Sequence, residues 1–306
     1  MGAQIHVGTF TRSLLIQIAR ITGGLERADL DVRESLVPSS PAQFQSLEAG
    51  EFDLVMTSPD NALAYRFLSQ NPLGRNIPVQ ILAAIDRGLG LSLCTAPGIK
   101  DAESIRGQGV GVDVPQSGFA FVAYALLENA GLLPGDYEIQ TLGSTPRRAE
   151  ALIAGACAAT VLNAGNELRA TGAGCTTVSR ATDLGPYLGT VLAALSPTNS
   201  IDEVSRLRFA DVLLETSHEI QTGRWEAEVI EQAMSLLDLT ESEARAHYLI
   251  LKDPKEGLVP GGIVDRESIA TLVGLRRKYL PSSELDVVAD SLSVLVNDRA
   301  LAASPA

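Results

Sequence analysis

The stretch that decides the fold is SSPAQFQSLEAGEFDLVMTSPDNAL, residues 39–63. The serine pair at its start can cap a helix, and Pro41 suits the first turn, where the N–H that proline lacks would have no partner. Gly50 can take the left-handed conformation that ends the helix. The apolar run at 52–57 is typical of a buried strand, and the polar residues at 58–61 end it and can cap a second helix. We therefore expect helix, strand, polar loop and helix in succession.

The same plan recurs at a constant offset of 105 residues, from 39 to 144, in STPRRAEALIAGACAATVLNAGNEL at 144–168. The register extends backwards, because Val7 falls on Val112 and the apolar helix expected after Thr11 falls on the one expected after Ser117. A unit repeated in register indicates one β-α-β-α plan used twice. Any two such units share a coarse pattern, but the gapless register favours two equivalent lobes.

Length and charge restrict the class of protein. A chain of 306 residues can bury a sizeable core and is expected to form two domains. The formal net charge of −13 argues against nucleic acid and anionic membrane surfaces as partners. It leaves a small anionic ligand possible, because helix N-termini can present a local cluster of N–H dipoles.

No apolar run has the length of a transmembrane helix, so we expect no direct membrane insertion. Strand-like sequence begins by Ile5, which leaves no room for a secretory leader. The expected compartment is therefore the cytoplasm, or the periplasm or a lipid-anchored extracytoplasmic location if a leader was removed. Cys94, Cys157 and Cys175 lie in apolar contexts typical of buried thiols, and a bridge between Cys157 and Cys175 stays open.

Two apolar strands, at 89–95 and 188–195, stand at the margins of the second lobe. We interpret them as two strand crossings between lobes. The predicted fold is α/β, with two Rossmann-like lobes, an interlobe cleft and a helical C-terminal region. The predicted bounds are 1–88 with 190–306 for lobe 1, and 89–189 for lobe 2. Helices are expected at 201–221, 224–236, 240–252 and 265–279, followed by a final helix and a fraying tail at 280–306.

Polar turns follow equivalent strands of the two lobes. Ligands of open parallel α/β sheets bind beyond the carboxyl ends of the strands, where helix N-termini present free N–H groups. Helix capping alone would explain any one turn, but four turns at equivalent strand ends favour a ligand cleft. The candidate ligand-binding residues in these turns are Thr9, Phe10, Thr11, Ser58, Asp60, Asn61, Gln116, Ser117, Gly118, Phe119 and Asn163.

Two further candidates lie beside the crossings. Arg87 could pair with a carboxylate or sulfonate, or simply with a neighbouring acid, and Tyr187 could stack on a planar ligand or pack at the hinge. The histidines are expected away from the four turns, and no motif for a metal or cofactor is present, so none is predicted. Asp60 is the only carboxylate in these turns and is the candidate acid or base if the protein is an enzyme.

LEAGEFDL at 47–54 resembles the L-x-x-G-x-x-D-[ILV] element of type II periplasmic substrate-binding proteins. LIAG at 152–155 repeats it with Ala158 in place of the aspartate, and GVDVPQSG at 111–118 is similar to the opening turn of their second lobe. The nearest branch contains sulfonate-, nitrate- and thiamine-pyrimidine-binding (NMT1/THI5-like) proteins. The resemblance covers about residues 4–200 and implies hinge closure around a ligand.

This resemblance implies a solute-binding protein that captures a small organic anion or planar heterocycle for an ABC importer. Its partners would be the small-molecule ligand and the transporter's membrane component. One alternative is an enzyme on the same scaffold, a decarboxylase, desulfinase or hydrolase acting on a small acidic or heterocyclic substrate. A cytoplasmic ligand sensor is another. The shortage of catalytic residues favours binding over catalysis.

Overall fold

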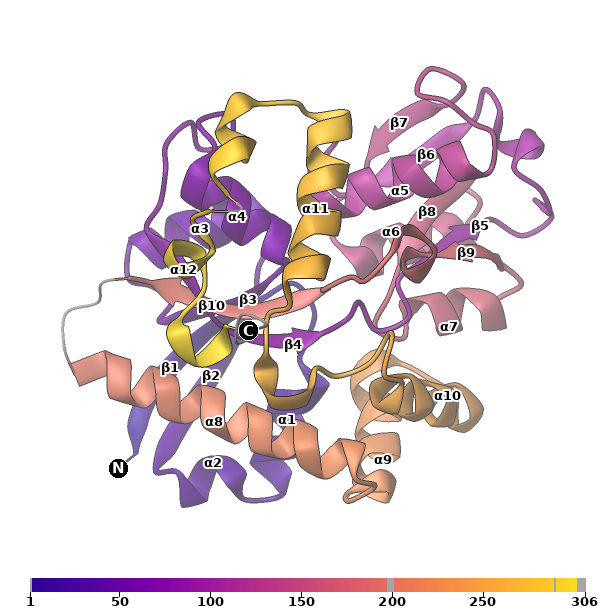
Figure 1. Ribbon diagram of the computed structural model, residues 1–306. Coiled ribbons are helices and arrows are strands. Elements are labelled where there is room, and N and C mark those ends of the chain that lie inside the picture. Colours follow the sequence, from indigo (N-terminus) through magenta and orange to yellow (C-terminus); the bar gives the residue numbers. More distant parts are fainter. Residues whose placement is uncertain (1, 197–200, 289, 302–306) are drawn as a thin grey trace.

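The computed structural model describes residues 2–196, 201–288 and 290–301 (Figure 1). Its strands form two five-stranded sheets, each at the centre of one lobe. The lobe 1 sheet has the order β2 (Leu30–Leu36), β1 (Ala3–Thr9), β3 (Leu54–Thr57), β10 (Thr190–Leu195) and β4 (Val79–Asp86). The lobe 2 sheet has the order β7 (Glu138–Thr141), β6 (Gly109–Val112), β8 (Ala159–Leu162), β5 (Ser92–Thr95) and β9 (Thr176–Arg180).

The two sheets are built alike, as the repeat predicts. In each, three parallel strands are followed by an antiparallel one, β10 in lobe 1 and β5 in lobe 2. The offset of 105 holds residue for residue in the central unit, because α3 (Ser40–Glu48) falls on α6 (Thr145–Ile153) and β3 falls on β8. The two-lobe α/β fold is confirmed.

Helices flank both sheets. Lobe 1 also carries α1 (Leu14–Ile21), α2 (Gly24–Arg27) and α4 (Pro59–Phe67). Lobe 2 also carries α5 (Gly118–Asn129), α7 (Asn166–Gly172) and the short 3-10 turns η1 (Glu103–Ile105) and η2 (Ala181–Leu184). Serine caps begin several of these helices, as in α4, where the Ser58 side chain accepts a hydrogen bond from the backbone N–H of Asn61.

The chain crosses between the lobes at 87–91 and 185–189, between strands rather than within them. The strands predicted from 89 and from 188 begin later, at Ser92 and Thr190. At the first crossing Gly88, Leu89 and Gly90 all have positive φ, which a strand cannot contain. The predicted residue bounds of the two lobes stay a prediction.

The C-terminal region is helical, as predicted, in α8 (Ile201–Gln221), α9 (Glu226–Leu237), α10 (Glu241–Lys252) and α11 (Arg266–Tyr279). Helix α8 packs against β1 and β4 of lobe 1, whereas α10 also contacts α7 of lobe 2. Helix α11 stands between α4 and α5 and contacts both (Figure 1). The region therefore touches both lobes.

The final helix predicted after residue 280 is wrong. The chain there forms short turns, η4 (Ser283–Val287), α12 (Leu292–Leu295) and η5 (Asp298–Ala300). The backbone of Val296 is extended and bridges to Ile81 of β4, and Leu301 bridges to Val264 after the short turn η3 (Pro260–Gly262). The segment covers lobe 1 with buried Leu285 and Leu295. The tail at 302–306 lies outside the described residues.

All three cysteines lie buried in one apolar cluster of lobe 2, and none forms a disulfide. The Cys157–Cys175 bridge that the sequence left open is therefore absent. Burial raises the pKa of Cys94 to about 12 and that of Cys157 to about 11, because an enclosed thiolate loses its hydration. These thiols are inert core residues.

Candidate functional site

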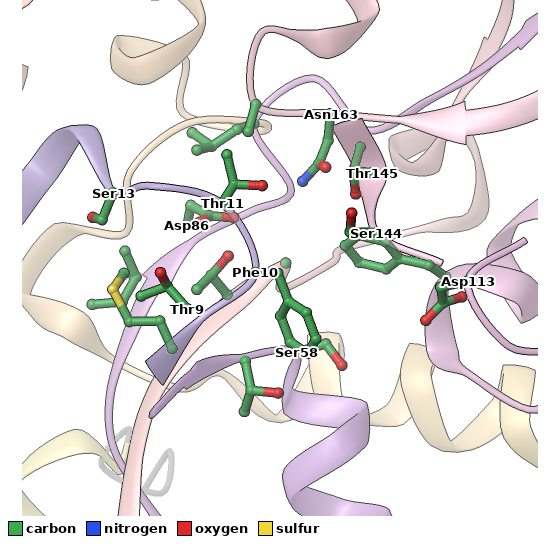
Figure 2. Close-up of a pocket in the computed structure, with 18 of the residues that line it drawn as sticks. Thr9, Phe10, Thr11, Ser13, Ser58, Asp86, Asp113, Ser144, Thr145 and Asn163 are labelled. Atoms are coloured by element: carbon green, nitrogen blue, oxygen red, sulfur yellow. The ribbon is translucent and has the colours of Figure 1, made fainter. Parts of the chain in front are cut away.

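A cavity of about 190 Å³ lies between the lobes, beyond the carboxyl ends of the strands. Figure 2 shows Thr9, Thr11 and Ser13 of lobe 1 on one side and Ser144 and Thr145 of lobe 2 on the other. Hydroxyl and amide groups supply most of its polar lining, while the rings of Phe10 and Phe119 supply apolar surface. The cavity is thus a cleft shared by the two lobes.

Five helices begin at this cavity, three from lobe 1 and two from lobe 2. Their N-cap residues all line it, and all are serines: Ser13, Ser39, Ser58, Ser117 and Ser144. In the first four, the serine hydroxyl accepts a hydrogen bond from a backbone N–H of the first helical turn. Each helix N-terminus carries a partial positive charge and unpaired N–H groups, which together favour an anion.

Arg148 adds a full positive charge to the wall. It is only 1% exposed and lies in the first turn of α6, where the helix dipole opposes a cation. Its Nη atoms donate to the carbonyl oxygens of Gly143 (2.6 Å) and Val161 (3.2 Å) and to Thr145 Oγ1 (3.1 Å). Its Nε–H has no partner among the described residues, and no carboxylate there lies within salt-bridge distance. Burial lowers the pKa of this guanidinium, and the more distant carboxylate of Asp113 partly offsets that effect.

Two carboxylates also line the cavity, and both are engaged by the protein. Asp86 at the end of β4 accepts the backbone N–H of Gly88 (2.8 Å), and burial raises its pKa to about 6. Asp113, at the end of β6, accepts the Ser117 hydroxyl. Behind the wall, Glu34 accepts the Thr9 hydroxyl (2.9 Å) and the Ser13 N–H (2.7 Å), and burial raises its pKa. Asp113 and Glu34 therefore hold the caps Ser117 and Ser13, whereas Asp86 holds the first crossing.

The structure brings nine of the predicted ligand-binding residues to the cavity, and whether they bind a ligand stays a prediction. They are Thr9, Phe10, Thr11, Ser58, Asn61, Ser117, Gly118, Phe119 and Asn163. Asn163 also ties the lobe 2 wall to the first crossing, because its amide donates to the Gly88 carbonyl (3.0 Å). Strand-end turns were therefore a sound guide to the position of the cleft.

Four predicted residues do not line this cavity. Asp60 is 1% exposed and forms a two-pronged ion pair with Arg276 of α11, at 2.8 and 2.6 Å. The carbonyl of Gln116 accepts from the same guanidinium (3.4 Å). Arg87 pairs with Asp265 (3.1 Å), and Tyr187 is fully enclosed at the second crossing. Asp60, Gln116 and Arg87 each bind a residue of the C-terminal region, which the turn pattern could not reveal.

Sequence reasoning missed other residues on the cavity wall, above all Ser39, Ser40, Ser144, Thr145, Asp86, Asp113, Arg148 and His247. The four hydroxyl residues begin the two repeated units, so the repeat itself carried the signal for them. His247 was expected away from the turns but lies against the cavity on α10. Only tertiary packing of the C-terminal helices brings it there.

The described residues contain no group of acidic, histidine or cysteine side chains that could hold a metal ion. None of the helices in the described ranges combines the length and the apolar character needed to cross a membrane.

No family model and no curated protein matches the sequence. Solved structures do match it. The alkanesulfonate-binding protein SsuA from Xanthomonas axonopodis pv. citri, bound to MOPS, has a TM-score of 0.71 at 13% identity over 99% of both chains. The chain has the periplasmic binding protein fold. The periplasmic nitrate-binding protein NrtA from Synechocystis matches with a TM-score of 0.73 at 11% identity, over 97% of this chain and 86% of its own.

A third match comes from outside the bacteria. A gene product of Candida albicans, described as defining a new family with the generic periplasmic binding protein fold, has a TM-score of 0.71 at 16% identity over 99% of both chains. Identities this low establish the fold alone. The predicted periplasmic binding protein architecture is thereby confirmed.

Proposed function

We propose that the protein is a solute-binding protein that captures a small organic anion in the cavity between its lobes. The observation that carries this proposal is Arg148, a buried guanidinium on the cavity wall with no carboxylate within salt-bridge distance among the described residues. A buried charge is costly unless it is paired, and Asp113 acts on it only from beyond that distance, so a closer counter-charge is expected from the ligand. The serine-capped helix N-termini around it reinforce the same sign.

The solved neighbours support an oxyanion as the charged group. Two of them are described as binding an alkanesulfonate and nitrate. We therefore propose that this chain belongs beside the sulfonate and nitrate branch, with a sulfonate, a carboxylate or a comparable oxyanion as the head group. The rings of Phe10 and Phe119 on the cavity wall would pack on the apolar or planar part of the ligand.

Delivery to an ABC importer completes the proposal. The binding protein would act in the periplasm or on a lipid anchor, and the membrane component of the transporter would be its partner. The enzymatic alternative assigned acid–base chemistry to Asp60, which instead holds Arg276 and does not line the cavity. The start of the natural gene separates importer from cytoplasmic sensor, because only the importer needs an upstream leader.

Native mass spectrometry of freshly purified protein should reveal a co-purified anion. A thermal-shift panel of sulfonates, carboxylates, nitrate, pyrimidines and organic cations should then identify the class. A ligand at about 100 times its dissociation constant adds roughly 2.7 kcal/mol to stability. We expect stabilisation by anions that disappears in Arg148→Gln. The proposal would be contradicted if only cations stabilised the protein. It would also be contradicted if no compound of the panel stabilised it and no molecule co-purified with it.

A further inference from the structure

The cavity has a second wall, made by different elements from the helix N-termini. The backbone of Leu258 bridges to Asp86, and Leu89 belongs to the first crossing. Leu251 and His247 lie one turn apart on the same face of α10, and Leu237 ends α9. All of these residues line the cavity. An apolar surface with one imidazole therefore faces part of the bound ligand.

His247 is an unsatisfied polar side chain. It is 1% exposed, and its Nδ1 is enclosed with no hydrogen-bond partner among the described residues. Buried polar atoms in native proteins are normally paired, and the exceptions call for an explanation. Nε2 has no hydrogen-bond partner among the described residues either, but it is not enclosed, so it is the ring nitrogen that a ligand in the cavity can reach.

The protonation state of His247 limits what it can bind. Burial lowers its pKa to about 4, so the ring is neutral at physiological pH, with one donor and one acceptor nitrogen. An enclosed acceptor atom without a hydrogen-bond partner is tolerated better than an enclosed N–H donor without one. The proton therefore belongs on Nε2, which leaves the N–H for the cavity.

The ligand group that meets this N–H is an uncharged oxygen. A second anionic group of the ligand would lie against Leu251 and Leu258, which would strip its hydration. It would also lie beside the carboxyl group of Asp86, which would oppose its negative charge. A hydroxyl, ether or carbonyl oxygen accepts from a neutral imidazole without that penalty.

We infer that the ligand is an organic anion with two recognised ends: an oxyanion head at Arg148 and the helix N-termini, and a neutral oxygen on a short apolar chain that accepts from His247. This inference rests on the proposed function and adds the class of substituent that the site selects. His247 is then a specificity-determining residue, and Arg148 supplies the charge recognition.

The test uses short alkanesulfonates of increasing chain length and their terminally hydroxylated counterparts, titrated calorimetrically into the wild type. We expect the hydroxylated member to bind about three- to tenfold more tightly at one chain length, as one neutral hydrogen bond allows. In His247→Leu this preference should vanish, whatever the change does to the affinity for the plain alkanesulfonates. His247→Gln, which keeps an N–H donor, should restore part of it. Leu249→Ala, on the exposed face of α10, is the matched control and should leave it unchanged.

The outcomes separate the two proposals. If the wild type binds plain sulfonates and shows no preference for the hydroxylated compound at any chain length, the role of His247 is overturned and the proposed function stands. The role of His247 is also overturned if His247→Leu shows the same preference as the wild type. Failure of every sulfonate and carboxylate to bind the wild type refutes the proposed function, and this inference falls with it. If His247→Leu does not fold, the wild-type chain-length series and His247→Gln decide.

Discussion

Gln43 in lobe 1 and Arg148 in lobe 2 occupy the same position of the repeat, 105 residues apart, and share one structural contact. Gln43 donates to the carbonyls of Gly8 and Met56, both at 3.0 Å. Arg148 donates to the carbonyl of Val161, which is the counterpart of Met56. A neutral amide is therefore enough to tie this helix to its strand. Arg148 alone of the two carries a charge and lines the cavity, and it also donates to Gly143 and Thr145.

The lobes differ at two further equivalent positions. Asp60, in the first turn of α4, corresponds to Gly165 in lobe 2, so at this repeated position only lobe 1 has a carboxylate, and it pairs with Arg276 of α11. Ala62, packed in the lobe 1 core, corresponds to Glu167, a carboxyl that is 3% exposed. Each departure from the shared plan places an ionisable group where the other lobe has none, and each is a place where the comparison can be tested.

The largest effect is expected from Asp60→Ala. It leaves the guanidinium of Arg276 buried without its partner, and breaking such a pair costs about 3–5 kcal/mol of unfolding free energy. Urea denaturation should show this loss, and adding Arg276→Met should recover much of it. Asp286→Ala removes the exposed partner of Arg277 and should cost no more than about 1 kcal/mol. Equal losses in Asp60→Ala and Asp286→Ala would mean that the buried pair does not join α11 to lobe 1.

Glu167→Gln should change how stability depends on pH. Burial raises the pKa of Glu167 from 4.5 to about 8, so between these values the folded chain holds a proton that the unfolded chain has lost. Wild-type stability should therefore fall as pH rises through this window. At about 1.4 kcal/mol for each pH unit, the variant should gain on the order of a few kcal/mol by the upper end. Denaturation at several pH values measures this, with the exposed Glu150→Gln as control. Parallel pH curves for wild type and Glu167→Gln would contradict it.

The Arg148→Gln variant places in lobe 2 the glutamine that lobe 1 has at the equivalent position, Gln43. The fold should persist, because glutamine can still donate to the Val161 carbonyl as Gln43 does to its own strand. Affinity for the anion found by the thermal-shift panel should fall about ten- to a hundredfold, as a hydrogen bond to a charged group is worth roughly 1.5–3 kcal/mol. Calorimetry should find no such loss in Arg147→Gln, which removes an adjacent exposed charge. Equal losses in both would mean that net charge, not the cavity wall, attracts the ligand.

Gly118→Ala should give the smallest loss. A Cβ atom there would lie 2.7 Å from the Cβ of Asp60, where the lobes meet, while the lobe 1 counterpart Ser13 carries a full side chain. Overpacking of this kind costs about 1–3 kcal/mol. Gly274→Ala in the middle of α11 meets nothing within 4 Å and should instead stabilise by roughly 0.5–1 kcal/mol. Thermal denaturation of both variants tests whether the contact between the lobes is as close as described.

The repeat made most of this fold predictable, because capping serines, prolines and glycines mark helix ends locally. Its register carries the observed bounds of α3 and β3 onto those of α6 and β8 residue for residue. The choice of partner was not predictable. Asp60 looked like a cleft carboxylate because nothing near it in sequence announces Arg276, which lies 216 residues away. Sequence reasoning missed His247 for the same reason, because only the packing of α10 places it at the cavity.

Helix α11 gives the molecule a third mechanical link. Its N-cap Asp265 holds Arg87 at the first crossing, while Arg276 and Tyr279 at its other end reach Gln116 and Glu128 of lobe 2. Its 14 residues make a strut of about 21 Å. Two crossings alone would define an axis about which the lobes turn freely, but a strut anchored far from that axis removes this freedom. Under the proposed function, ligand exchange requires this strut to detach, so we expect the residence time to depend on the contacts of α11 as well as on those inside the cavity.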